Sequence, residues 1–131
     1  MRRGLRIAPR FGGVFIEGLG RAEGGADEMN KLEAGYASHL ELQRLEGRVL
    51  AWRWQPFSMR LAPSLFYRPD FLVQLTDRRL EIHETKGFWR DDARVKIRAA
   101  AEMFPMFAFI AISRSQAGGW DIERFSPAVA P

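Results

Sequence analysis

The sequence lacks cysteine altogether, which excludes disulfide bonds, thiolate metal sites and cysteine nucleophiles. It also lacks a long apolar run. The longest stretch without a charge, roughly 103–113, is shorter than the twenty or so residues that cross a bilayer, so we expect no transmembrane helix and no membrane partner. The first residues contain no apolar core of a secretory signal either. Together these absences favour the cytoplasm.

The composition is that of one globular domain with a basic character. The chain has 131 residues, 47% of them hydrophobic and 12% aromatic, which is enough for one core and too little for two ordinary domains. Its net charge is +4, and 17 of its 20 basic residues are arginines, whose guanidinium groups bind phosphates in a bidentate manner. A nucleic-acid partner fits this composition, although the base composition of a gene can also favour arginine.

Residues 1–28 differ from the rest of the chain. They contain seven glycines, four arginines before the first acidic residue, and one short apolar run at Val14–Ile16. We interpret them as a basic, glycine-rich arm with at most one edge strand. A transit peptide is the alternative, but the glycines disrupt amphipathicity and serine is absent. Residues 29–126 then form a single domain, and 127–131 a tail rich in proline and alanine.

Hydrophobic periodicity and turn residues predict the order helix, three strands, helix, strand. The first helix begins with a capping box at Asn30, and the second is capped by Asp91 or Asp92. The predicted elements are a helix at 30–46, strands at 49–54, 66–75 and 80–86, a helix ending at Pro105, a strand at 106–112 and a short strand at 120–125. This order implies an α/β fold in which a mixed central sheet is flanked by helices.

The strand at 80–86 departs from its own pattern. Leu80 and Ile82 define an apolar face, and the next residues on that face are Glu84 and Lys86. Burying charged groups beside apolar ones is unfavourable unless they are paired or bind a metal. Asp70 lies fourteen residues before Glu84, and an antiparallel hairpin that turns at 76–79 brings the two carboxylates together.

Two carboxylates beside an ammonium group suit Mg²⁺ or Mn²⁺, which prefer oxygen ligands and retain several waters. Such a site hydrolyses phosphodiesters: the metal activates a water, while Lys86 orients or deprotonates it or stabilises the transition state. Glu33 on the first helix is a candidate third carboxylate, or it only bonds the Asn30 amide. The plain alternatives are a strand-edge role for Asp70 and an ordinary ion pair between Glu84 and Lys86.

Pro69-Asp70 followed by Glu84-Thr85-Lys86 resembles the PD-(D/E)XK signature of the restriction-endonuclease-like nuclease superfamily. The superfamily core has the element order predicted above, so the resemblance covers roughly residues 30–112. The chain is most similar to small phage-encoded members that resemble Holliday-junction resolvases. The shared features are Glu33 and Tyr36 on the first helix, Gln55-Pro56 after the first strand, and a basic second helix.

The resemblance implies a restriction-endonuclease-like core and a metal-dependent endodeoxyribonuclease. It implies Asp70, Glu84 and the Thr85 carbonyl as ligands of Mg²⁺ or Mn²⁺, Lys86 as the group that positions the water, and Glu33 as an auxiliary acid. It also implies branched DNA such as a Holliday junction as substrate, a homodimer, and the cytoplasm of a bacterium or phage-infected host. The competing functions are a transposase-like or nonspecific DNA-cutting subunit, a non-catalytic nucleic-acid-binding module, and an unrelated α/β domain with a fortuitous motif.

The second helix supplies candidate DNA contacts. Arg90, Arg94 and Arg98 recur every four residues, with Lys96 beside them, and form either a phosphate-binding stripe or a solvated face. Trp89, in the loop just after the lysine of the motif, is the best candidate for stacking on a base.

Other aromatic residues are expected to be structural. Trp52 and Trp54 fit the core better than a base-stacking platform. His39 and His83 have no metal-ligand spacing, and alternation places His83 on the face opposite Glu84.

Overall fold

The computed structural model describes residues 10–11, 14–15, 19–20 and 28–125. Most of the predicted arm at 1–28, and the tail at 127–131, therefore lie outside the described residues. The strand expected near Val14 is present as β2 (Val14–Phe15), which pairs with β1 (Arg10–Phe11). Neither helix in the described part of the chain has the length and apolarity needed to cross a membrane.

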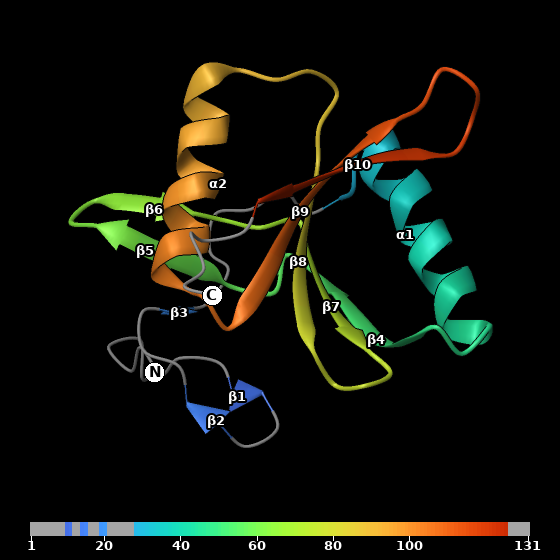
Figure 1. Cartoon of the computed structure of the whole chain (residues 1–131), viewed down its shortest axis with the longest axis horizontal. Coiled ribbons are helices and arrows are strands. Elements are labelled where there is room, and N and C mark those ends of the chain that lie inside the picture. Colours follow the sequence, from blue (N-terminus) through green and yellow to red (C-terminus); the bar gives the residue numbers. More distant parts are fainter. Residues whose placement is uncertain (1–9, 12–13, 16–18, 21–27, 126–131) are drawn as a thin grey trace, which may run out of the picture.

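The described residues form an α/β fold around a five-stranded mixed sheet (Figure 1). The sheet order is β10-β9-β8-β7-β4; β8 and β9 are parallel, and the other neighbours are antiparallel. A separate small sheet contains β3, β5 and β6. The elements are β3 (Leu19–Gly20), α1 (Lys31–Leu45), β4 (Val49–Trp54), β5 (Ser58–Ala62), β6 (Leu65–Tyr67), β7 (Phe71–Leu75), β8 (Leu80–Thr85), α2 (Asp91–Met103), β9 (Phe107–Arg114) and β10 (Trp120–Phe125).

Helix α1 begins at the predicted capping box. The Asn30 side chain accepts the Glu33 N–H at 2.8 Å, and the Glu33 carboxylate accepts the Asn30 N–H at 2.9 Å, so two N–H groups of the first turn are satisfied. The helix ends just before Gly47, whose φ of 82° suits glycine. Its buried face packs over β4 and β8 and shares one apolar cluster with the sheet: Tyr36, Ala37, Leu40, Val49, Phe71, Val73, Ile110 and Ile112.

Helix α2 lies on the opposite face of the sheet (Figure 1). Its N-cap is Arg90, which makes no capping side-chain bond, so the predicted cap at Asp91 or Asp92 is wrong. Both aspartates lie in the first turn instead, where negative charge interacts favourably with the helix dipole. Its apolar face, formed by Ile97, Ala100, Ala101 and Phe104, is buried in the core.

The predicted single strand at 66–75 is wrong. The chain leaves the small sheet after β6 and enters the central sheet at β7, with Pro69 between them. Proline has no N–H for a ladder, which explains the break. Strand β6 pairs with β5 in a hairpin that the sequence pattern did not reveal, turning through Ser64 at a φ of 62°. This hairpin packs against α2 and places Tyr67 beside β8.

Candidate active site

Asp70 and Glu84 face each other across the β7–β8 hairpin. Phe71 pairs with His83, so the next residues outward, Asp70 and Glu84, are also opposite each other. The Asp70 backbone N–H donates to Glu84 Oε1 at 3.1 Å. The prediction that the hairpin brings Asp70 and Glu84 together is therefore confirmed.

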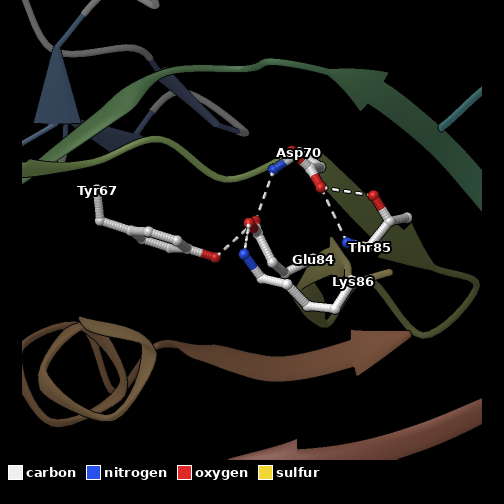
Figure 2. A network of polar contacts seen from close by, with 5 residues as sticks. All are labelled: Tyr67, Asp70, Glu84, Thr85 and Lys86. Atoms are coloured by element: carbon white, nitrogen blue, oxygen red, sulfur yellow. Dashed lines mark hydrogen bonds and ion pairs between the residues drawn. The ribbon is translucent and has the colours of Figure 1, made fainter. Parts of the chain in front are cut away.

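Glu84 is buried on the α2 face of β8. Ile82 on the same face is fully buried in the core, and Glu84 itself is only 8% exposed, which confirms the charged continuation of an apolar face. Its carboxylate has two further partners (Figure 2). The Tyr67 hydroxyl donates to Oε1 at 3.0 Å, and Lys86 Nζ lies 3.2 Å from Oε2.

Asp70 is held through one of its two carboxylate oxygens. The Thr85 backbone N–H and hydroxyl donate to Oδ2 at 2.9 and 2.7 Å (Figure 2). The other oxygen, Oδ1, accepts no hydrogen bond from residues 28–125. Asp70 therefore has a fixed orientation and one oxygen left for a ligand.

The site is short of positive charge. Burial raises the pKa of Asp70 to about 7, and the nearby Glu84 carboxylate adds to the rise. Burial also raises the pKa of Glu84, although Lys86, the Tyr67 hydroxyl and the Asp70 N–H act in the opposite direction. Within residues 28–125, Lys86 is the one cation in contact with this carboxylate pair, and a further cation would stabilise both carboxylates in their charged forms.

The donor set fits Mg²⁺ or Mn²⁺. Asp70 and Glu84 supply hard oxygen ligands, and Asp70 Oδ1 accepts no hydrogen bond from residues 28–125. Within the described part of the chain, no group of three or more His, Asp or Glu side chains is placed to hold a metal. The protein would therefore supply two carboxylates and leave other positions to water or backbone oxygens, as is usual for Mg²⁺. The Thr85 carbonyl as a ligand stays a prediction.

Glu33 lies near this site but has a structural partner. It is 8% exposed, and its carboxylate completes the α1 capping box. It also contributes, as the last of several causes, to the raised pKa of Asp70. Its role as an auxiliary acid stays a prediction.

A pocket of about 260 Å³ lies beside Glu84, between the end of β6, the end of β8 and the first turns of α2. Lys96 lines it, which places one predicted DNA contact next to the carboxylates. Arg68 also lines the pocket. Arg68 was not among the candidates from the sequence, although it directly precedes Pro69-Asp70 and so had to lie close to the carboxylates. The lining residues are Tyr67, Arg68, Glu84, Lys86, Asp92, Ala93, Lys96 and Ile97.

The other predicted DNA contacts, Arg90, Arg94, Arg98 and Trp89, do not line this pocket. Trp89 nevertheless lies beside the site, because Lys86 Nζ is 5.8 Å from its ring centroid. Arg94 forms an ion pair with Glu123 of β10, and its guanidinium lies 4.3 Å from the Trp89 ring centroid. Arg98 lies 5.7 Å from the Phe125 ring. Trp89 is half-buried and packs on the same phenylalanine at 5.8 Å between centroids. Arg94 and Arg98 of α2 and the preceding loop residue Trp89 thus contact β10, and their contact with DNA stays a prediction.

The opposite face of β8 carries a structural polar network. His83 Nδ1 lies 2.6 Å from the Tyr36 hydroxyl, and His83 Nε2 lies 2.8 Å from Glu81 Oε1. Burial raises the pKa of Tyr36, so its hydroxyl stays protonated. His39 stacks on Tyr36 with centroids 5.4 Å apart. Both histidines thus have the structural roles that the sequence predicts.

Trp52 and Trp54 pack against the apolar cluster under α1, as predicted. The residue that sequence reasoning missed at the centre of the site is Tyr67, because nothing in its own spacing links it to Glu84. Comparison with family models, curated proteins and solved structures finds no match for this chain.

Proposed function

We propose that the protein is a metal-dependent endonuclease that hydrolyses phosphodiester bonds in DNA. The observation that carries the proposal is the arrangement of Asp70, Glu84 and Lys86: a part-buried and a buried carboxylate on facing strand ends, with an ammonium 3.2 Å from the buried one. A buried ion pair with an excess negative charge is unfavourable for folding alone, which favours a ligand-binding role.

The architecture supports placing the chain in the restriction-endonuclease-like superfamily. The core order is helix, strand, hairpin strands β7 and β8, helix, and a strand parallel to β8. The signature residues Asp70, Glu84 and Lys86 lie at the ends of β7 and β8. The additional β5–β6 hairpin is an insertion between the first two strands of that order.

In this mechanism Asp70 and Glu84 hold Mg²⁺ or Mn²⁺. When bound, such a metal would supply activation of water and neutralisation of charge on the phosphodiester. Lys86, already beside Glu84, orients the attacking water or donates to a phosphate oxygen as negative charge develops. The Tyr67 hydroxyl and the Thr85 donors keep the two carboxylates in place. Lys96 and Arg68 attract the DNA backbone to the pocket.

The test is cleavage of a labelled four-way junction and of a matching linear duplex, with Mg²⁺, with Mn²⁺ and with EDTA. The variants are Asp70→Ala, Lys86→Ala and the near-isosteric Glu84→Gln. Asp77→Asn is the matched control, since Asp77 lies on the same hairpin but pairs with Arg79 at the surface. We expect metal-dependent cleavage that all three site variants abolish and the control retains. DNA binding without cleavage under either metal would leave a non-catalytic binding module.

Branched DNA as the preferred substrate, and a homodimer as the active form, extend the proposal from the resemblance. A symmetric dimer places two sites where two strands must be cut. Preferential junction cleavage by a species whose mass by light scattering is twice that of the chain would support both. Equal cleavage of junction and duplex would keep the nuclease and favour a nonspecific or transposase-like enzyme.

A further inference from the structure

An exposed phenylalanine stands in the loop between Lys86 and α2. Phe88 is 72% exposed, more than any other large hydrophobic side chain in the described part of the chain. Leaving such a ring in water forgoes about 1.5–3 kcal/mol of burial. Its neighbour Trp89 packs inward instead, against Phe125 and beneath the Arg94 guanidinium. The loop is thus anchored by Trp89, while Phe88 is directed outward.

A cation accompanies the exposed ring. The Arg90 guanidinium lies 5.7 Å from the Phe88 ring centroid. A planar guanidinium beside an aromatic ring offers both a stacking surface for a base and a donor for the adjacent phosphate. The two side chains therefore have the chemistry of a nucleic-acid contact.

The loop lies close to the candidate catalytic residues. Phe88 follows Lys86 by two residues, so their Cα atoms are at most about 7 Å apart. Successive bases along one DNA strand are separated by about 3.4 Å of helix rise. The Phe88 side chain therefore leaves the backbone close to that of Lys86, within a few base steps along a DNA strand, and Figure 1 shows the loop running from the end of β8 to the start of α2.

We propose that Phe88, supported by Arg90, stacks on an unpaired or unstacked base next to the cleaved phosphate. A base in an intact duplex has both faces covered by its neighbours, whereas a base at a branch point or mismatch exposes one. The contact therefore selects DNA with an opened stack. This inference rests on the proposed nuclease function for its meaning, but it is tested by binding alone.

The experiment measures the affinity of the full-length protein for a four-way junction and for a linear duplex by fluorescence anisotropy, with Ca²⁺ and with EDTA. Phe88→Ala removes the ring, Phe88→Leu keeps apolar volume without a planar face, and Phe88→Trp keeps a planar ring. Leu45→Ala is the control, since Leu45 is 68% exposed at the end of α1. Base stacking on an aromatic ring predicts at least about a fivefold loss of junction affinity for alanine and leucine. Tryptophan and the control should match the wild type, and duplex binding should be unchanged.

Three results would overturn the inference. The first is a Phe88→Leu variant that binds junctions as tightly as the wild type. The second is an equal loss of duplex and junction affinity in all Phe88 variants. The third is a change in the mass of the protein in light scattering on Phe88→Ala, which would assign the ring to an interface between copies. Cleavage of linear duplex by the wild type is measured separately. If the wild type cleaves DNA but the Phe88 variants bind junctions normally, only the stacking role is refuted. If the Phe88 variants lose junction affinity selectively but the wild type cleaves no DNA, only the nuclease function is refuted.

Discussion

Replacing Asp70 by asparagine is expected to stabilise the metal-free protein at neutral to alkaline pH. Burial and the Glu84 charge raise the pKa of Asp70 from 3.8 to about 7. Because the folded protein then holds a proton that the unfolded chain releases, folding stability falls as the pH rises from about 4 to about 7. At about 1.4 kcal/mol per pH unit, the decrease is at most about 4 kcal/mol.

The expected gain is smaller than that ceiling. Asp70 is only part-buried, and water and Lys86 screen part of its repulsion from Glu84. An asparagine oxygen can still accept the two Thr85 donors, so the existing hydrogen bonds survive. We expect a gain of about 1–2 kcal/mol above pH 7, or roughly 3–10 °C in melting temperature.

The assay is thermal unfolding of wild type and Asp70→Asn from about pH 4 to pH 8, with EDTA and then with Mg²⁺. The stability gap should be largest at the alkaline end and close near the acidic end. Mg²⁺ should stabilise the wild type, by about 2.7 kcal/mol at a hundred times its dissociation constant, and leave the variant unchanged. The surface control Asp77→Asn should lose stability, because its partner Arg79 lowers the pKa of Asp77. An Asp70→Asn variant that melts below the wild type at alkaline pH would refute the reasoning.

Substitutions at three further residues separate the roles of neighbouring groups. Tyr67→Phe removes a buried donor to Glu84, and we expect about 1–2 kcal/mol lower stability in denaturant unfolding and a higher metal requirement for cleavage; an unchanged metal titration would contradict a positioning role. Tyr36→Phe should lower stability by about 1–2 kcal/mol through loss of its bond to His83, yet leave the metal titration unchanged, because this network lies on the other face of β8. Glu33→Gln keeps a capping oxygen and removes the charge, whereas Glu33→Ala removes both. Loss of cleavage in both variants, with loss of stability only in alanine, would support an auxiliary acid; full cleavage by the glutamine variant would leave Glu33 a capping residue.

Much of the fold could be predicted because its signals are local. The capping box at Asn30 and the helical spacing of apolar residues locate α1 to within a residue at each end. The polar turn at 76–79 locates the β7–β8 hairpin. The β5–β6 hairpin was missed because its strands are short and the turn signals at Pro63-Ser64 and Pro69-Asp70 were not used, so residues 66–75 were interpreted as one strand. The order of strands across the sheet also depends on packing that no local pattern encodes.

The central residues of the site could be predicted because charged side chains interrupt an apolar strand face. Charged residues at Glu84 and Lys86 continue an apolar face, and the hairpin register assigns Asp70 to the same place; the structure confirms both placements. The contacts of the basic side chains on α2 could not be predicted in this way. A spacing of four residues places Arg90, Arg94 and Arg98 along one side of a helix, but it does not say whether that side meets solvent or β10.

The hairpin that the sequence concealed is what gives the predicted residues their chemical environment. Without β5 and β6, the Glu84 and Lys86 side chains at the end of β8 would be exposed to solvent beside α2, and their ion pair would contribute little to stability. Met59 of β5 is fully buried against the same core, and Tyr67 of β6 donates to Glu84 from a buried position. Burial by this hairpin raises the affinity of the carboxylates for any cation, proton or metal. The β5–β6 hairpin, which lies between β4 and β7 in the chain, therefore forms one side of the candidate site, and its Tyr67 contacts Glu84.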